Sequence, residues 1–177
     1  MRVGIAHHFG WGIAVTADDR HDVVDRRRIE LVEDGLTPAP IHYDRATSDD
    51  LTLAALVAEV RASVARATTA ALDALPSGVT SISLRAWPAD FPEDIATLRS
   101  NAYEAKADSV MYVQILDDVA HERGWTVHQF NAATVEAEAA ALLGARAQDV
   151  LHGPRQRLGA PWAKDHRVAL AATVLAR

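Results

Sequence analysis

Residues 3–16 read VGIAHHFGWGIAVT. Two short apolar runs, 3–6 and 13–16, flank a connection that contains two glycines, Gly10 and Gly12. Apolar runs on either side of a glycine-containing turn predict a β-hairpin. Two adjacent histidines, His7 and His8, would then lie at the tip of this hairpin. An imidazole pair at a strand end is the first candidate functional feature of the chain.

Length and composition predict one soluble domain. A chain of 177 residues with 49% hydrophobic content is long enough for one buried core, so a single domain over 1–177 is expected. No apolar run reaches the roughly 18 residues of a membrane span, and no basic segment with a long apolar core begins the chain. The absence of cysteine excludes disulfides and thiolate metal sites and agrees with a cytoplasmic location.

Charge argues against a broad nucleic-acid-binding surface. The formal net charge is −6, and non-specific binding to a phosphate backbone requires a basic face. Arg26-Arg27-Arg28 is the densest basic run. On a strand, Arg27 would point away from its two neighbours. Such a run is typical of a solvated edge strand that resists sheet-to-sheet association.

Strands and helices alternate along the rest of the chain. Further strands are expected at 21–33, 79–84 and 125–130, helices at 51–75, 103–123, 132–143, 147–151 and 163–176, and a long loop at 34–50. Ser48 or Asp49 can serve as the N-cap of the first long helix. Three consecutive strands followed by alternating helices and strands predict an α/β fold, with a mixed five-stranded sheet and helices on both faces.

This element order is similar to that of the ribonuclease H-like superfamily. Gly4-Ile5-Ala6 followed by Gly10-Trp11-Gly12-Ile13-Ala14 resembles the first hairpin of RuvC-type resolvases and their relatives, where a Gly-Ile-Asp start leads into a glycine-containing second strand. Asp165-His166-Arg167-Val168-Ala169-Leu170-Ala171 is similar to the last helix of that family, which carries Asp, two residues, Asp, then Ala-Leu-Ala. The two motifs bracket nearly the whole chain.

The resemblance implies a chemistry for which most ligands are missing. The family cleaves phosphodiesters with two divalent cations. These cations are held by carboxylates from the first strand, the fourth strand and the last helix. Magnesium requires oxygen ligands. The corresponding positions here are occupied by Ala6 or His7, by Arg85 and Trp87, and by Asp165 and Val168. One carboxylate of about four is retained, so a standard two-magnesium site is not expected.

A site rebuilt around imidazole is one alternative. The candidate catalytic residues are then His7, His8, Asp165 and His166. His7, Asp165 and His166 could hold zinc, manganese or iron better than magnesium. Asp165 and His166 could also form an acid–base pair without a metal. Against both, adjacent strand residues point to opposite faces, and Asp165 could simply stabilise the first turn of the last helix.

Arg85 and Trp87 are the candidate substrate-binding residues. At a strand end, an arginine can hold a phosphate or carboxylate with its planar fork, and a tryptophan can stack on a base. Trp87 could equally pack under the turn at 88–92. Glu104 and Asp108 share one helix face, for which a solvated role is expected, and the loop segment 42–44 is expected to be ordinary polar surface.

Two functions from different classes remain open, so whether the chain is an enzyme is undecided. One is a divergent hydrolase that acts on nucleic acid or another phosphate ester. The other is a catalytically inactive domain that serves as a binding or assembly module, including as a homodimer. The hydrolase predicts that His7, His8, Asp165 and His166 converge in one cleft. The module predicts that they are scattered and that an apolar patch forms a subunit interface.

Overall fold

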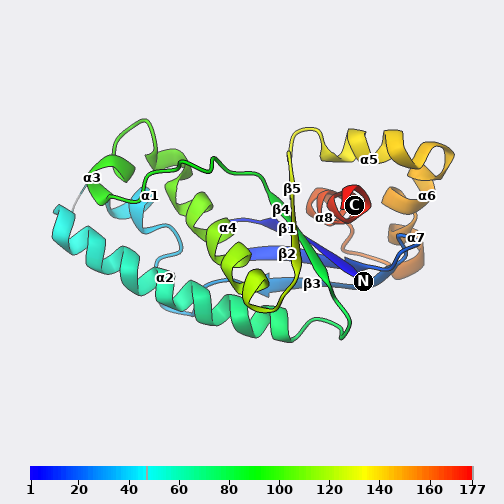
Figure 1. Cartoon of the computed structure of the whole chain (residues 1–177), viewed down its shortest axis with the longest axis horizontal. Coiled ribbons are helices and arrows are strands. Elements are labelled where there is room, and N and C mark those ends of the chain that lie inside the picture. The colour runs from blue at the N-terminus through cyan, green and yellow to red at the C-terminus, as the bar shows by residue number, and fades with distance from the viewer. Residues whose placement is uncertain (47, 177) are drawn as a thin grey trace.

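A five-stranded mixed sheet forms the centre of the molecule (Figure 1). The computed structural model describes residues 1–46 and 48–176. Its strands are β1 (Arg2–His7), β2 (Trp11–Ala17), β3 (Val23–Glu30), β4 (Ser81–Arg85) and β5 (Thr126–Phe130), in the spatial order β3-β2-β1-β4-β5. The first three strands are antiparallel, whereas β4 runs parallel to β1 and β5 parallel to β4. The predicted α/β class and the opening hairpin are confirmed.

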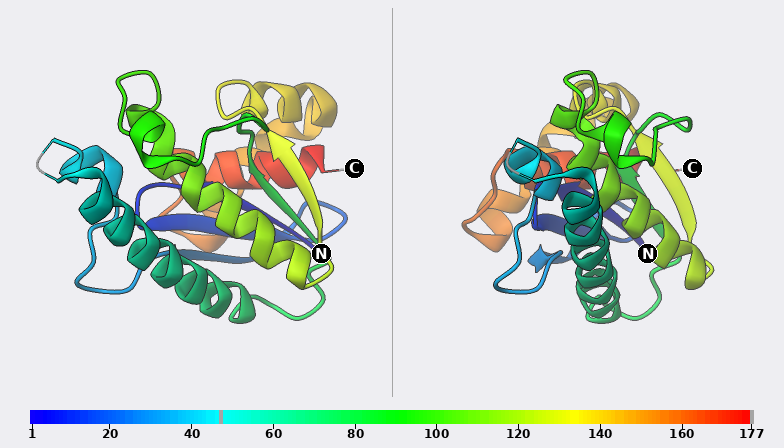
Figure 2. Two further views of the ribbon diagram at one scale, coloured as in Figure 1. Left: turned by 60° about the vertical axis from the view of Figure 1, so that its left-hand side comes forward. Right: turned by 90° about the vertical axis from the view of Figure 1, so that its left-hand side faces the viewer.

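Helices cover both faces of this sheet (Figures 1 and 2). They are α1 (Pro40–Asp44), α2 (Asp50–Asp73), α3 (Ile95–Leu98), α4 (Glu104–Glu122), α5 (Val135–Leu143), the 3₁₀ turn η1 (Gly144–Arg146), α6 (Ala147–His152), α7 (Pro154–Leu158) and α8 (Lys164–Leu175). On one face α4 lies on the strands with α2 beside it, and on the other face α8 lies under α5. None of the described helices is long and apolar enough to cross a membrane.

Alternation along β1 divides its side chains between two cores. Val3 and Ile5 belong to the core beneath α2 and α4, and Ala6 belongs to the core beneath α8. Between them stands Gly4, where an added Cβ would lie 1.9 Å from the carbonyl oxygen of Ala169 in α8. Glycine is therefore required at position 4, because the backbone of α8 passes directly over the strand. This close approach brings the start of α8 to the carboxyl end of β1.

Short helices account for the main differences from the predicted elements. The expected loop at 34–50 contains α1, whose first residue is a proline, the residue type best suited to that position. No helix is expected between residues 151 and 163, yet α7 lies there, and it also begins with a proline. The N-cap of α2 is Asp49, whose carboxylate accepts from Thr52 N at 2.8 Å. With five residues each, α1 and α7 are too short for a periodic pattern to indicate them.

The arginine run of β3 alternates as predicted. Arg27 donates to the carbonyl of Ala74 at the end of α2, on one face of the sheet. Arg26 donates on the other face, to three carbonyls between residues 158 and 161. The edge strand is therefore tied to segments on both faces, and only part of its basic run is solvated.

Candidate functional site

Three elements meet at the carboxyl ends of the parallel strands β1 and β4. His7 ends β1, Arg85 ends β4, and α8 begins beside them with Asp165 in its first turn. A hollow of about 400 Å³ opens here, lined by both histidines of the hairpin, Phe9, Trp11, Arg85, Ala105 and Ser109. Ligands of open α/β sheets commonly bind outside the carboxyl ends of the strands. We refer to this hollow as the β1–β4 site.

His8 and Asp165 form a hydrogen-bonded pair at the rim of this site. The His8 Nε2 atom lies 3.0 Å from the Oδ2 atom of Asp165. The His8 ring stacks on Trp11, with ring centroids 4.2 Å apart and planes 18° from parallel. The guanidinium of Arg28 lies 4.1 Å from the centroid of the same Trp11 ring. The imidazole is thus fixed by a carboxylate at one edge and by an aromatic ring at its face, while the side chain stays 42% exposed.

His7 differs sharply from its neighbour. Its residue is only 2% exposed, and its Nε2 atom is hydrogen bonded to Ser109 Oγ of α4 at 3.1 Å. Burial, assisted by the nearby Arg85 cation, lowers the pKa of His7 to about 4. Within the described chain, its Nδ1 atom is buried without a hydrogen-bond partner. His7 is therefore neutral at neutral pH and is held as part of the floor of the site.

Arg85 and Trp87 lie where substrate-binding residues were predicted. Both line a second hollow of about 330 Å³, which shares His7, Ala105 and Ser109 with the first. Trp87 is half-buried and also packs against the core beneath α4, so features of both interpretations are present. The Arg85 guanidinium is exposed and forms no hydrogen bond or ion pair with any residue in 1–46 or 48–176.

His166 does not join the other three candidates. It is 5% exposed, its Nδ1 atom accepts from Ala163 N at 3.3 Å, and its ring lies against Trp162 at 5.4 Å. Burial and the Arg26 cation lower its pKa. Successive helix residues project about 100° apart, so Asp165 can face His8 while His166 turns toward Trp162. His166 caps the start of α8 instead.

The donor set does not fit a resident metal ion. Among the described residues, no group of three or more His, Asp or Glu side chains is placed to hold one. The proposed ligands His7, Asp165 and His166 have three different partners, namely Ser109, His8 and Ala163. The Arg85 cation, which stands at a position where the resembled family has a carboxylate, would also repel a divalent ion.

A second polar cluster lies beside the site, between α1 and α4. His42 Nδ1 and Glu104 Oε1 are 2.5 Å apart, and the ring of His42 lies 6.2 Å from that of Phe9 at the hairpin tip. Asp108 is 1% exposed and accepts hydrogen bonds from the backbone N–H groups of Ile41 and His42. The prediction of a solvated face is wrong for both Glu104 and Asp108. The segment around α1 packs over Asp108, and the Glu104 side chain is only 13% exposed and pairs with His42 and Arg45.

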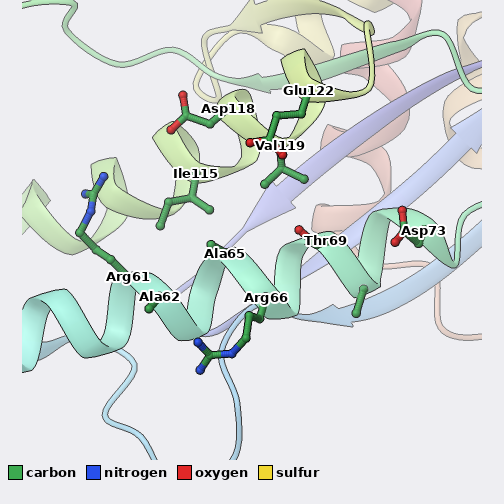
Figure 3. A pocket seen from close by; sticks show the side chains of 11 residues that line it. Arg61, Ala62, Ala65, Arg66, Thr69, Asp73, Ile115, Asp118, Val119 and Glu122 are labelled. Atoms are coloured by element: carbon green, nitrogen blue, oxygen red, sulfur yellow. The ribbon is translucent and has the colours of Figure 1, made fainter.

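Sequence reasoning missed Ser109, Arg28 and the part that Trp11 has in the site. Ser109 lies in the middle of a helix, where serine gives no distinctive pattern, and Arg28 was assigned only to a solvated edge. A further hollow of about 660 Å³ lies between α2 and α4, with Ile115 and Val119 pointing toward α2 (Figure 3). It contains none of the predicted site residues.

Comparisons with protein families and with curated proteins found no relative of this chain. No protein-family model matches the chain, and no curated protein is significantly similar to it. The functional argument therefore depends on the geometry of the site.

Proposed function

We propose that the chain is a divergent ribonuclease H-like hydrolase that cleaves a phosphate ester without a metal ion. The observation that carries this proposal is the His8–Asp165 hydrogen bond of 3.0 Å at the edge of a hollow that also contains an unpaired arginine. The strand order β3-β2-β1-β4-β5 supports the proposed superfamily, because three antiparallel strands followed by two parallel ones are typical of it.

The acid–base part of the proposal follows from the geometry of His8. Its Nε2 atom faces the Asp165 carboxylate, so Nε2 carries the hydrogen and Nδ1 has the free lone pair. A carboxylate in this position fixes the tautomer and stabilises the imidazolium that forms when the ring accepts a proton. Trp11 holds the ring plane. The imidazole therefore has the arrangement of a general base.

In the proposed reaction Arg85 binds the phosphate group and His8 activates water. The guanidinium of Arg85 would hold two phosphate oxygens in a bidentate contact. His8 Nδ1 takes a proton from water as the water oxygen bonds to phosphorus, and the bond from phosphorus to the leaving oxygen breaks. Bulk water then protonates that oxygen, and the hydroxide so formed takes the proton from the His8 imidazolium, which restores the base. His7 stays neutral, so Arg85 is the cation that offsets the developing charge.

The test is hydrolysis of generic aryl phosphate mono- and diesters and of single-stranded, hybrid and branched nucleic acids. The wild-type chain is expected to turn over at least one of these substrates in the presence of chelator. His8→Ala should lower kcat by about 100-fold or more, the usual contribution of a general base. Asp165→Asn should lower kcat by a smaller factor. Arg85→Gln should mainly raise KM, because it removes the anion contact.

The matched control is His152→Ala. His152 is an exposed histidine at the end of α6. Activity that survives in His8→Ala, or that disappears with chelator, would overturn the proposal.

An inactive binding domain is the second candidate, and one observation favours it. Arg85, Trp87 and the floor residue His7 all line the second hollow, which does not include the His8–Asp165 pair. If the chain binds a phosphate-containing ligand through Arg85 and no substrate is hydrolysed, the binding module is the correct interpretation.

A further inference from the structure

A fourth hollow lies at the other end of the sheet from the β1–β4 site. It has a volume of about 470 Å³ and lies where the start of β1, the β2–β3 turn and η1 come together. Each of these segments contributes a nitrogen-bearing side chain, namely Arg2, His21 and Arg146. Leu142 and Leu143 of α5 form an apolar wall beside them. Figure 1 shows β1 starting near the end marked N and running away from it across the sheet, and its last residue is His7.

We propose that this hollow binds a phosphate group through Arg2, Arg146 and the imidazole of His21. Two arginines with different locations in the chain converge on one cavity, which is the arrangement that recognises oxyanions. Asp19 also lines the hollow, and its carboxylate lies 3.5 Å from Arg2, with the Asp19 side chain 87% exposed. Two guanidinium groups against this one lining carboxylate leave the hollow with a net positive charge.

Both guanidinium groups keep donors for a ligand. Arg146 gives one bond, from Nη2 to the carbonyl of Arg20 at 2.8 Å, and Arg2 gives the single contact to Asp19. Each guanidinium has five N–H donors. Among the described residues no other hydrogen bond or ion pair of these two side chains is present. Most of their donors are therefore available to the hollow.

His21 adds an independent indication of a ligand. It has a φ of 69°, in the left-handed region, which few side chains other than those of Asn, Asp and His adopt. Its Nδ1 atom is buried and has no hydrogen-bond partner among the described residues. A buried nitrogen without an acceptor is best left unprotonated, so the hydrogen lies on Nε2 and can be donated to an anion.

The electrostatics of the cluster agree with an anionic ligand. Burial lowers the pKa of His21, and the positive charges of Arg2 and Arg146 lower it further, whereas Asp18 and Asp19 act in the opposite direction. The ring thus lies in a positive field and stays neutral. The leucine wall suits an organic group attached to the phosphate better than it suits free phosphate, and this distinguishes the two sources of the same chemistry.

The experiment measures phosphate binding by the full chain in an Arg85→Gln background, so that the β1–β4 site does not contribute. Inorganic phosphate and phenyl phosphate are titrated by calorimetry and by thermal shift, with sodium chloride at equal ionic strength as reference. Both phosphates are expected to bind, phenyl phosphate the more tightly. Arg146→Gln should weaken binding about tenfold or more, the effect of losing a charged contact.

His21→Gly and Arg157→Gln make the test specific. Glycine tolerates a φ of 69°, so His21→Gly should fold normally and yet lose about tenfold in affinity. Arg157→Gln removes an equal charge from α7 and should bind like the parent chain. The proposal is overturned if phosphate acts no differently from chloride, or if Arg146→Gln and His21→Gly bind as Arg157→Gln does. Because activity is not measured, the result is independent of the proposed hydrolase.

Discussion

At the scale of the residue, the adjacent histidines His7 and His8 have opposite environments, because His7 is buried and His8 is exposed. Strand alternation predicts that they face different ways, and the structure confirms this. Alternation does not indicate which histidine becomes buried, because Ser109 and Arg85, which surround His7, come from elements more than 70 residues away. The His8–Asp165 contact was predictable only from the resemblance of the two ends of the chain. Helix geometry alone argues against grouping His166 with Asp165, because successive helix residues project in different directions.

His7 makes stability depend on pH. Its pKa is about 4 in the folded chain against 6.5 for a free histidine, and the difference of about 2.5 units corresponds to about 3 kcal/mol. The unfolded chain binds the extra proton, so this stability is full above pH 6.5 and is lost as the pH falls toward 4. Urea unfolding between pH 7.5 and 4.5 should show that the free energy of unfolding decreases as the pH falls, and that this decrease is smaller in His7→Gln. His152→Gln should retain the wild-type loss.

At the scale of the element, the fold was predictable where the pattern was long or repeated. The hairpin, α2, α4 and α8 follow from alternation, helical periodicity and flanking glycines. In contrast, α1 depends on Asp108, a carboxylate more than 60 residues away that accepts its two amide hydrogens. A helix held by a distant side chain leaves no local signature. That α8 lies beside β1 was expected only from the resemblance, and Gly4, which permits the close contact with Ala169, was noted only as part of a family-like motif.

Gly4→Ala should separate β1 from α8. The added methyl group would meet the carbonyl of Ala169 at 1.9 Å, and backbone cannot move aside as a flexible side chain can. Overpacking of this kind costs about 2 kcal/mol or more, so chemical denaturation should show a large loss of stability. The control Gly12→Ala, on the same hairpin, adds a methyl group 3.3 Å from its nearest neighbour and should cost less. Equal losses in the two variants would contradict the close contact.

At the scale of the whole molecule, two buried ionisable groups, Asp108 of α4 and His7 packed against α4, have opposite effects on how stability depends on pH. Asp108 holds the segment around α1 against α4, and His7 holds the end of β1 against the same helix. Burial raises the pKa of Asp108 to about 6 from 3.8, while burial lowers that of His7. Their effects on stability therefore have opposite signs over nearly the same range of pH.

The contribution of Asp108 to the stability of the fold should fall as the pH rises. Since its folded pKa lies above its unfolded one, the folded chain binds the extra proton, and the benefit falls from pH 4 to pH 6 and stays low above it. The shift of about 2 units corresponds to about 3 kcal/mol. The stability difference between wild type and Asp108→Asn should shrink by that amount between pH 4 and 7. Asp118→Asn, an exposed substitution on α4, should show no such trend.

The His8–Asp165 hydrogen bond joins two residues 157 positions apart. Such a contact closes nearly the whole chain into one loop, which costs more entropy than a local contact does, and it needs both ends of the chain to be present. A ribosome-bound chain that has released its hairpin but not its last helix therefore lacks the dyad. Any activity that depends on the pair would begin only when α8 docks, so turnover would report the completion of folding rather than its start.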